Sequence, residues 1–173
     1  MRTKLTLALG LVVLAVLNLG IYRKERFIEI AEEVFFELAP ADSRSLLQGD
    51  YMRLNYKIVN DLRGYSQKSG NEDFPQNGKV KVKLDGRRVA SLKGIWEGEP
   101  LMENERLLRY RKIGNWQIKV GSESFFFEEG QGKEYERARY GVLKLGKDSQ
   151  TILRGLADKD LVLIEPVSGK KSP

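Results

Sequence analysis

The sequence contains no histidine and no cysteine. A Ser-His-Asp triad, a thiolate nucleophile and the usual ligand sets for zinc, haem and iron–sulfur clusters all need one or both of these side chains. Their absence argues against a hydrolase or a metalloenzyme, and we expect no catalytic residue, no metal and no cofactor. The lack of cysteine does not assign a compartment, because a disulfide-free domain is stable in oxidising and in reducing spaces.

No clustered charge of one sign stands out either. The chain has 30 basic and 24 acidic residues, a formal net charge of +6, and the two signs are interleaved, as in residues 133–137, K-E-Y-E-R. Phosphate recognition by nucleic-acid-binding proteins needs basic residues gathered on one face, so we do not expect nucleic-acid binding. A length of 173 residues allows one domain and a short additional element.

One long segment has no charge at all. Residues 5–22 carry only uncharged side chains and would reach about 27 Å as a helix, which is just enough to span a bilayer. Tyr22, an aromatic residue typical of the membrane interface, and a basic run at 23–26 end it. We interpret residues 1–26 as an uncleaved membrane anchor with basic flanks. The alternative is a cleaved signal peptide, which would have a shorter apolar core followed by small residues.

The orientation of the anchor does not follow from charge, because Arg2 and Lys4 on one side balance the basic run on the other. A short polar lead before an apolar run usually stays in the cytoplasm. We therefore predict a single pass that leaves residues 27–173 outside the cytoplasm. The basic run beside the membrane would also attract anionic headgroups, which makes membrane lipid an expected partner.

Residues beyond the anchor have short, alternating patterns. We expect the helix to continue to about residue 31, a strand at 33–39, and one helical turn at 44–48. Between residues 51 and 59, a period of two predicts a strand. Its buried face would carry Met52, Leu54, Tyr56 and Ile58.

A hairpin is the clearest local prediction. Residues 79–84 alternate between lysine and apolar side chains, Asp85-Gly86 marks a tight turn, and residues 87–95 return. Residues 61–78 are rich in glycine, proline and polar side chains and predict a mobile loop, whereas residues 132–139 suit a helical segment. Further short strands are expected at 106–112, 117–120, 124–127, 142–145, 151–153 and 161–164.

These patterns predict a mainly β fold. The expected architecture is an antiparallel β domain at residues 27–166 with one or two short helices, preceded by a single N-terminal transmembrane helix. The small and polar residues 167–173 predict a disordered tail.

The most specific motif lies at residues 49–56, which read G-D-Y-M-R-L-N-Y. This motif resembles the signature of the GDYXXLXY family of bacterial membrane-anchored proteins. Three other blocks, at 40–47, 126–130 and 136–141, are similar to further blocks of that family, so the resemblance covers roughly residues 5–165. It implies a protein of the bacterial inner (cytoplasmic) membrane that accompanies a multi-pass integral membrane protein, with no activity assigned.

The motif also supplies the candidate binding residues. Glycine permits a positive φ and aspartate accepts backbone N–H bonds, so Gly49 and Asp50 suit a turn before the strand. Asp50 could also pair with Arg44 or Arg139, or face a partner. We interpret the aliphatic and aromatic positions as buried packing residues. The full set is Asp42, Arg44, Gly49, Asp50, Tyr51, Leu54, Tyr56, Glu129, Gly130, Arg139, Tyr140 and Gly141.

Residues 45–51 are also similar to the S-M-x-P-[ST]-L-x-x-G-D segment of signal peptidases. Aligned on Gly49-Asp50, the nucleophile position of that family falls on Ala41. The lysine base of the family lies in a K-R-V-type strand, whose nearest match is residues 87–89, with Arg87 at the lysine position. Alanine cannot attack a carbonyl, and a guanidinium cannot act as a base near neutral pH. The resemblance therefore implies a β architecture without its nucleophile.

Two classes of function stay open on the sequence. The first is a membrane-anchored, non-catalytic accessory or interaction domain. The second is an extracytoplasmic enzyme or small-ligand-binding domain that uses Asp50, Glu129 and Arg139 in a cleft. Paired carboxylates such as Glu129 and Glu136 could divide acid and base roles as in glycosidases. Nearby basic residues favour simple surface pairing instead.

Overall fold

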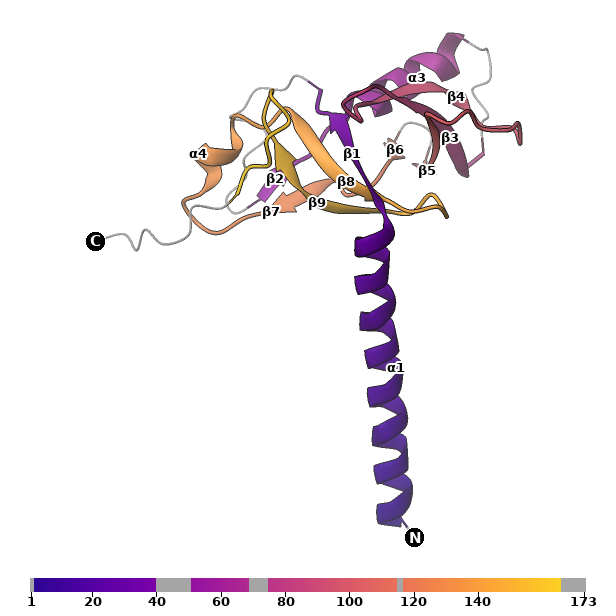
Figure 1. The fold of residues 1–173 in the computed structure, drawn as a ribbon, viewed down its shortest axis with the longest axis vertical. Coiled ribbons are helices and arrows are strands. Elements are labelled where there is room, and N and C mark those ends of the chain that lie inside the picture. Colours follow the sequence, from indigo (N-terminus) through magenta and orange to yellow (C-terminus); the bar gives the residue numbers. More distant parts are fainter. Residues whose placement is uncertain (1, 40–50, 69–74, 115–116, 166–173) are drawn as a thin grey trace. The chain divides into compact units, whose positions relative to one another are not determined.

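The computed structural model describes residues 2–39, 51–68, 75–114 and 117–165 (Figure 1). The chain divides into two compact units, Met1–Ala31 and Glu32–Pro173.

The first unit is one helix, α1, at Arg2–Ile30. Its end confirms the prediction that the helix continues to about residue 31. Four consecutive side chains, Leu11 to Leu14, are between 51% and 69% exposed. Because successive helical residues point about 100° apart, apolar side chains are uncovered on every side of α1. A search restricted to the described residues finds no helix that is both long and apolar enough to cross a membrane, so the anchor predicted from the uncharged residues 5–22 stays a prediction.

The described residues of the second unit form three antiparallel sheets, which confirms the mainly β prediction. One sheet has the order β1-β8-β9, one pairs β2 with β7, and one has the order β4-β3-β5-β6. Among the described residues, the helices α3 and α4 interrupt the strands. The bounds are β1 Glu32–Glu37, β2 Tyr51–Arg53, α3 Lys57–Lys68, β3 Asn77–Leu84, β4 Ala90–Ile95, β5 Glu105–Ile113, β6 Gln117–Lys119, β7 Ser124–Phe126, α4 Gly132–Tyr135, β8 Tyr140–Leu145 and β9 Thr151–Ala157.

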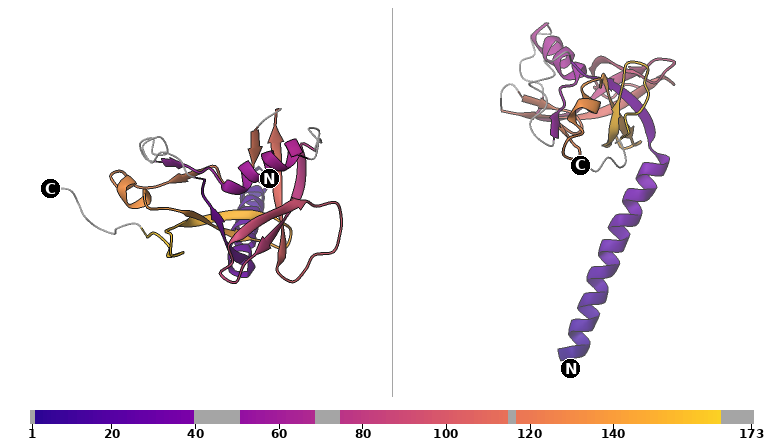
Figure 2. Two further views of the ribbon diagram at one scale, coloured as in Figure 1. Left: turned by 90° about the horizontal axis from the view of Figure 1, so that it is seen from above. Right: turned by 90° about the vertical axis from the view of Figure 1, so that its left-hand side faces the viewer.

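The larger of the two hydrophobic clusters among the described residues joins the three sheets and α3. Its fully buried members include Phe36 of β1, Leu62 of α3, Leu108 of β5 and Leu143 of β8. Helix α3 lies against β4 (Figures 1 and 2). In β3 and β5 buried residues alternate with more exposed ones, which explains why the period of two predicted these strands correctly.

The predicted hairpin is β3 and β4, but its turn is longer than the Asp85-Gly86 pair. Leu84 is the register partner of Ala90, so five residues connect the strands. A carboxylate oxygen of Asp85 accepts hydrogen bonds from the backbone N–H groups of Arg87 and Val89, both at 2.8 Å. The side chain of Asp85 therefore organises the turn, and Arg88 adopts a positive φ of 62° within it.

The predicted strand at 51–59 is wrong beyond Arg53, and helix α3 begins at Lys57 instead. The predicted loop at 61–78 is wrong at both ends, because α3 continues to Lys68 and β3 begins at Asn77. Ile58, Val59 and Leu62 are all buried, which is the spacing of one helical face. The four side chains assigned to the buried face of the strand are indeed buried, but Ile58 reaches the core from the helix.

Two smaller predictions also need correction. Residues 161–164 form no strand: Leu163 makes an isolated bridge to Ala157, and Leu161 has a φ of 66° that interrupts extended structure. The helix expected at 132–139 is only the short α4. The helical turn expected at 44–48 and the tail at 167–173 lie outside the described residues.

Candidate functional site

The described part of the signature begins with β2, which pairs with β7. Met52 lies opposite Phe125, and the ring of Tyr51 lies against that of Phe126 with centroids 5.7 Å apart. Met52 is buried and Tyr51 is half-buried. Asp42, Arg44, Gly49 and Asp50 lie outside the described residues, so the predicted pairing of Asp50 stays a prediction.

The second half of the signature connects three segments of the chain. The Leu54 N–H donates to the carbonyl of Glu123 at 2.8 Å, and the Asn55 carbonyl accepts from the Ala39 N–H at 2.6 Å. Tyr56 forms a bridge with Leu38, just after β1. Leu54 and Tyr56 are buried, which confirms their interpretation as packing residues.

The packing of Tyr56 explains why a glycine, Gly141, occurs in the separate block at residues 136–141. Its ring is 2% exposed and lies on Gly141 of β8, where an added Cβ would be only 2.7 Å from Cε1. The ring of Phe36 meets it edge-on at 6.3 Å. Burial raises the pKa of Tyr56 well above its usual range, and its hydroxyl has no hydrogen-bond partner among the described residues. These motif residues therefore hold β1 and β8 to the start of α3.

Among the motif residues that the structure describes, no charged cleft surrounds Glu129. Glu129 and Arg139 are both exposed and make no ion pair with each other in the described ranges. One guanidinium nitrogen of Arg139 donates to the Ala138 carbonyl at 2.9 Å. Gly130 has a positive φ of 84°, and Tyr140 begins β8 half-buried. No group of three or more acidic residues that could hold a metal occurs in the part of the chain that is described.

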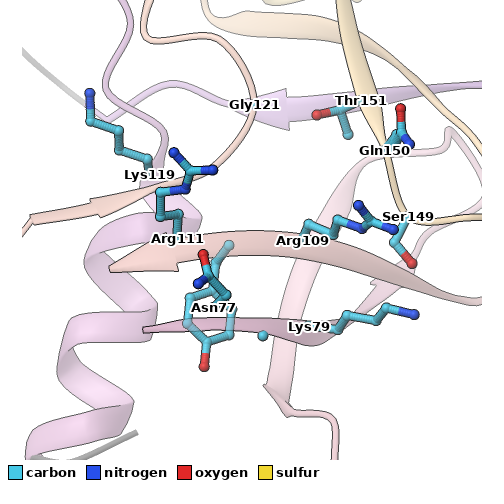
Figure 3. A pocket seen from close by; sticks show the side chains of 11 residues that line it. Asn77, Lys79, Arg109, Arg111, Lys119, Gly121, Ser149, Gln150 and Thr151 are labelled. Atoms are coloured by element: carbon cyan, nitrogen blue, oxygen red, sulfur yellow. The ribbon is translucent and has the colours of Figure 1, made fainter. Parts of the chain in front are cut away.

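A second candidate site is a hollow of about 700 Å³ between the β3-β5-β6 sheet and the β8–β9 turn (Figure 3). Sequence analysis did not predict it. Four of its lining residues are basic and none is acidic. The lining consists of Asn77, Gly78, Lys79, Arg109, Tyr110, Arg111, Lys119, Gly121, Ser149, Gln150 and Thr151.

The pairing of β3, β5 and β6 places the four basic residues next to one another. Lys79 of β3 is the register partner of Arg109 of β5, and Arg111 is the partner of Lys119 of β6. Arg109 and Arg111 alternate with the buried Leu108 and Tyr110, so they share the opposite face of the sheet. Like charges directly opposite each other in a sheet are destabilising, and this hollow contains two such pairs side by side.

The four basic side chains differ in what compensates their charge. Lys119 forms an ion pair with Glu123. The Lys79 ammonium lies over the ring of Trp96, 5.3 Å from its centroid. Arg109 and Arg111 make no ion pair with any residue that the structure describes. The two arginines are therefore the principal uncompensated charges of the hollow.

The β8–β9 turn closes one side of the hollow. The Ser149 carbonyl accepts from the Arg109 N–H at 3.3 Å, which places the turn beside β5. Ser149 adopts a positive φ of 66° and is 1% exposed, and its hydroxyl has no hydrogen-bond partner in the described ranges. A strained backbone and an unpartnered polar group at one residue are features that often mark functional positions.

Comparison with known proteins identifies one family. No curated protein and no solved structure matches the chain. A family model described as "GDYXXLXY protein" matches residues 13–156, which is more than half of the sequence. The chain belongs to the GDYXXLXY protein family.

Proposed function

We propose that this protein is a membrane-anchored, non-catalytic accessory domain that is exposed outside the cytoplasm and associates with a multi-pass membrane protein. The observation that carries the proposal is the uncovered apolar surface of α1. A helix that is apolar on every side is unstable in water and needs lipid or other helices around it. The sequence supports the same assignment, because residues 5–22 contain no charge.

The β domain supports an accessory role rather than catalysis. Leu54, Tyr56 and Gly141 are occupied in packing. Glu129 and Arg139 do not form a paired acid–base cluster. We propose an inner-membrane location with a single pass, where the basic run at 23–26 lies beside lipid headgroups. A reporter enzyme that is active only outside the cytoplasm, fused after Pro173, should therefore be active.

Alkaline carbonate extraction of membranes tests the anchor. We expect the wild-type chain to stay in the membrane pellet and Val12→Glu/Val16→Glu to leave it, because two carboxylates in the uncharged segment are costly in lipid. Ile28→Glu/Ile30→Glu adds the same charge outside that segment and should stay in the pellet. Release of the wild-type chain by carbonate would contradict membrane anchoring.

Mild cross-linking in native membranes tests the association. We expect purification of the tagged chain to recover a multi-pass membrane protein in stoichiometric amount. Asp50→Ala, compared at equal expression and equal thermal stability, should lose this partner if the Asp50 side chain contacts it. Recovery of the wild-type chain alone would contradict the accessory role.

A further inference from the structure

We propose that the hollow between β3, β5, β6 and the β8–β9 turn binds a phosphate group, with Arg109 and Arg111 as its main ligands. This site is separate from the signature motif and does not depend on the accessory function. Its volume of about 700 Å³ is within the range of small-ligand sites in proteins.

Charge is the first argument. Four basic side chains from three strands line the hollow without an acidic neighbour among the lining residues. Of the four, Lys119 alone has a carboxylate partner within the described ranges, Glu123. The two like-charged cross-strand pairs, Lys79 with Arg109 and Arg111 with Lys119, lower the stability of the empty sheet. A bound group with two negative charges would remove that repulsion.

The type of side chain is the second argument. Arg109 and Arg111 lie two residues apart on one strand, so both guanidinium groups project from the same face. Figure 3 shows Arg109 extending toward Ser149 and Arg111 toward Lys119. Guanidinium groups match the oxygens of phosphate with two parallel hydrogen bonds, and such charge-assisted bonds are stronger than neutral ones.

The β8–β9 turn supplies the third and independent argument. Ser149 lines the hollow, and its buried hydroxyl has no hydrogen-bond partner among the described residues. A buried hydroxyl without an acceptor destabilises the fold, whereas a phosphate oxygen in the hollow would accept its proton. Thr151, also in the lining, offers a second hydroxyl from the same hairpin.

The phosphate could belong to a soluble molecule or to a lipid headgroup. Thermal unfolding of the full chain in non-ionic detergent separates the two. One series adds inorganic pyrophosphate at constant ionic strength, and another replaces phosphatidylcholine in mixed micelles by phosphatidylglycerol. We expect at least one of the two to raise the melting temperature in a saturable manner. A response to pyrophosphate assigns a soluble source, and a response to phosphatidylglycerol alone assigns a headgroup.

Variants connect the response to the hollow. Arg109→Gln/Arg111→Gln should weaken binding by at least about tenfold, since two charge-assisted contacts are lost. Without ligand it should be no less stable than wild type, because the like-charge repulsion is relieved. Ser149→Ala should also weaken binding. Arg87→Gln/Arg137→Gln removes the same charge from two exposed arginines outside the hollow and should bind like wild type.

Three results would overturn the proposal. The first is the absence of a saturable shift with both probes. The second is equal binding by wild type and Arg109→Gln/Arg111→Gln, which would place the ligand elsewhere. The third is an equal shift with citrate at the same ionic strength, which would show that the hollow does not select phosphate.

Discussion

At the scale of single residues, the contact between Tyr56 and Gly141 leaves no room for a side chain at position 141. Gly141→Ala would place a Cβ 2.7 Å from a buried ring atom. We expect a loss of about 1–3 kcal/mol in the free energy of unfolding, because Tyr56 is buried and its ring also contacts Phe36, so the added methyl group overpacks the core. Urea unfolding of the full chain in detergent measures this loss.

Two variants test the reason for that loss. Gly86→Ala, where an added Cβ would meet nothing within 4 Å, should change stability by less than about 0.5 kcal/mol. Tyr56→Phe should not rescue Gly141→Ala, because the ring remains in contact. A Gly141→Ala protein as stable as wild type would show that Tyr56 does not lie on Gly141 as described.

At the scale of elements, the sequence predicts strands better than it predicts α3. Residues 79–84 alternate over a full strand, so local pattern alone is sufficient. In α3, the apolar residues Ile58, Val59 and Leu62 cover only one face of the helix. The rest of the segment consists mainly of polar residues and Gly64, a composition that is as common in loops as in helices. The basic hollow was missed for a different reason. Arg109 meets Lys79 only through strand register, which no single segment of sequence contains.

Substitutions of Gly64 test whether this segment is the helix α3 or the loop that the sequence predicted. It lies within α3, and an added Cβ would meet nothing within 4 Å. We expect Gly64→Ala to raise the free energy of unfolding by about 0.5–1 kcal/mol, because alanine has the higher helix propensity. Gly64→Pro should lower it by about 3 kcal/mol or more, since proline removes a helical hydrogen bond. Tolerance of proline in urea unfolding would contradict a helix at this position.

At the scale of the whole molecule, buried tyrosine hydroxyls make the free energy of unfolding depend on pH in the alkaline range. Burial raises the pKa of Tyr56, Tyr110 and Tyr135 above the ordinary value of 10.0. A group whose pKa is higher in the folded state contributes its full stability below its unfolded pKa and loses it as the pH rises beyond that value. We therefore expect the free energy of unfolding to fall above about pH 10, as the unfolded chain ionises its tyrosines while the folded core resists.

The pKa values of Lys57 and Lys81 are also raised, so these lysines contribute to the alkaline loss of stability as well. Tyr56→Phe measures the contribution of the Tyr56 hydroxyl separately. Phenylalanine keeps the ring on Gly141 but cannot ionise, so the variant should lose less stability than wild type between pH 9 and pH 11 in urea unfolding. Near pH 7 it should be at least as stable, because it removes a buried hydroxyl that has no partner among the described residues. Parallel alkaline losses in the two proteins would mean that the Tyr56 hydroxyl reaches water, and the packing assigned to the last residue of the signature would then be wrong.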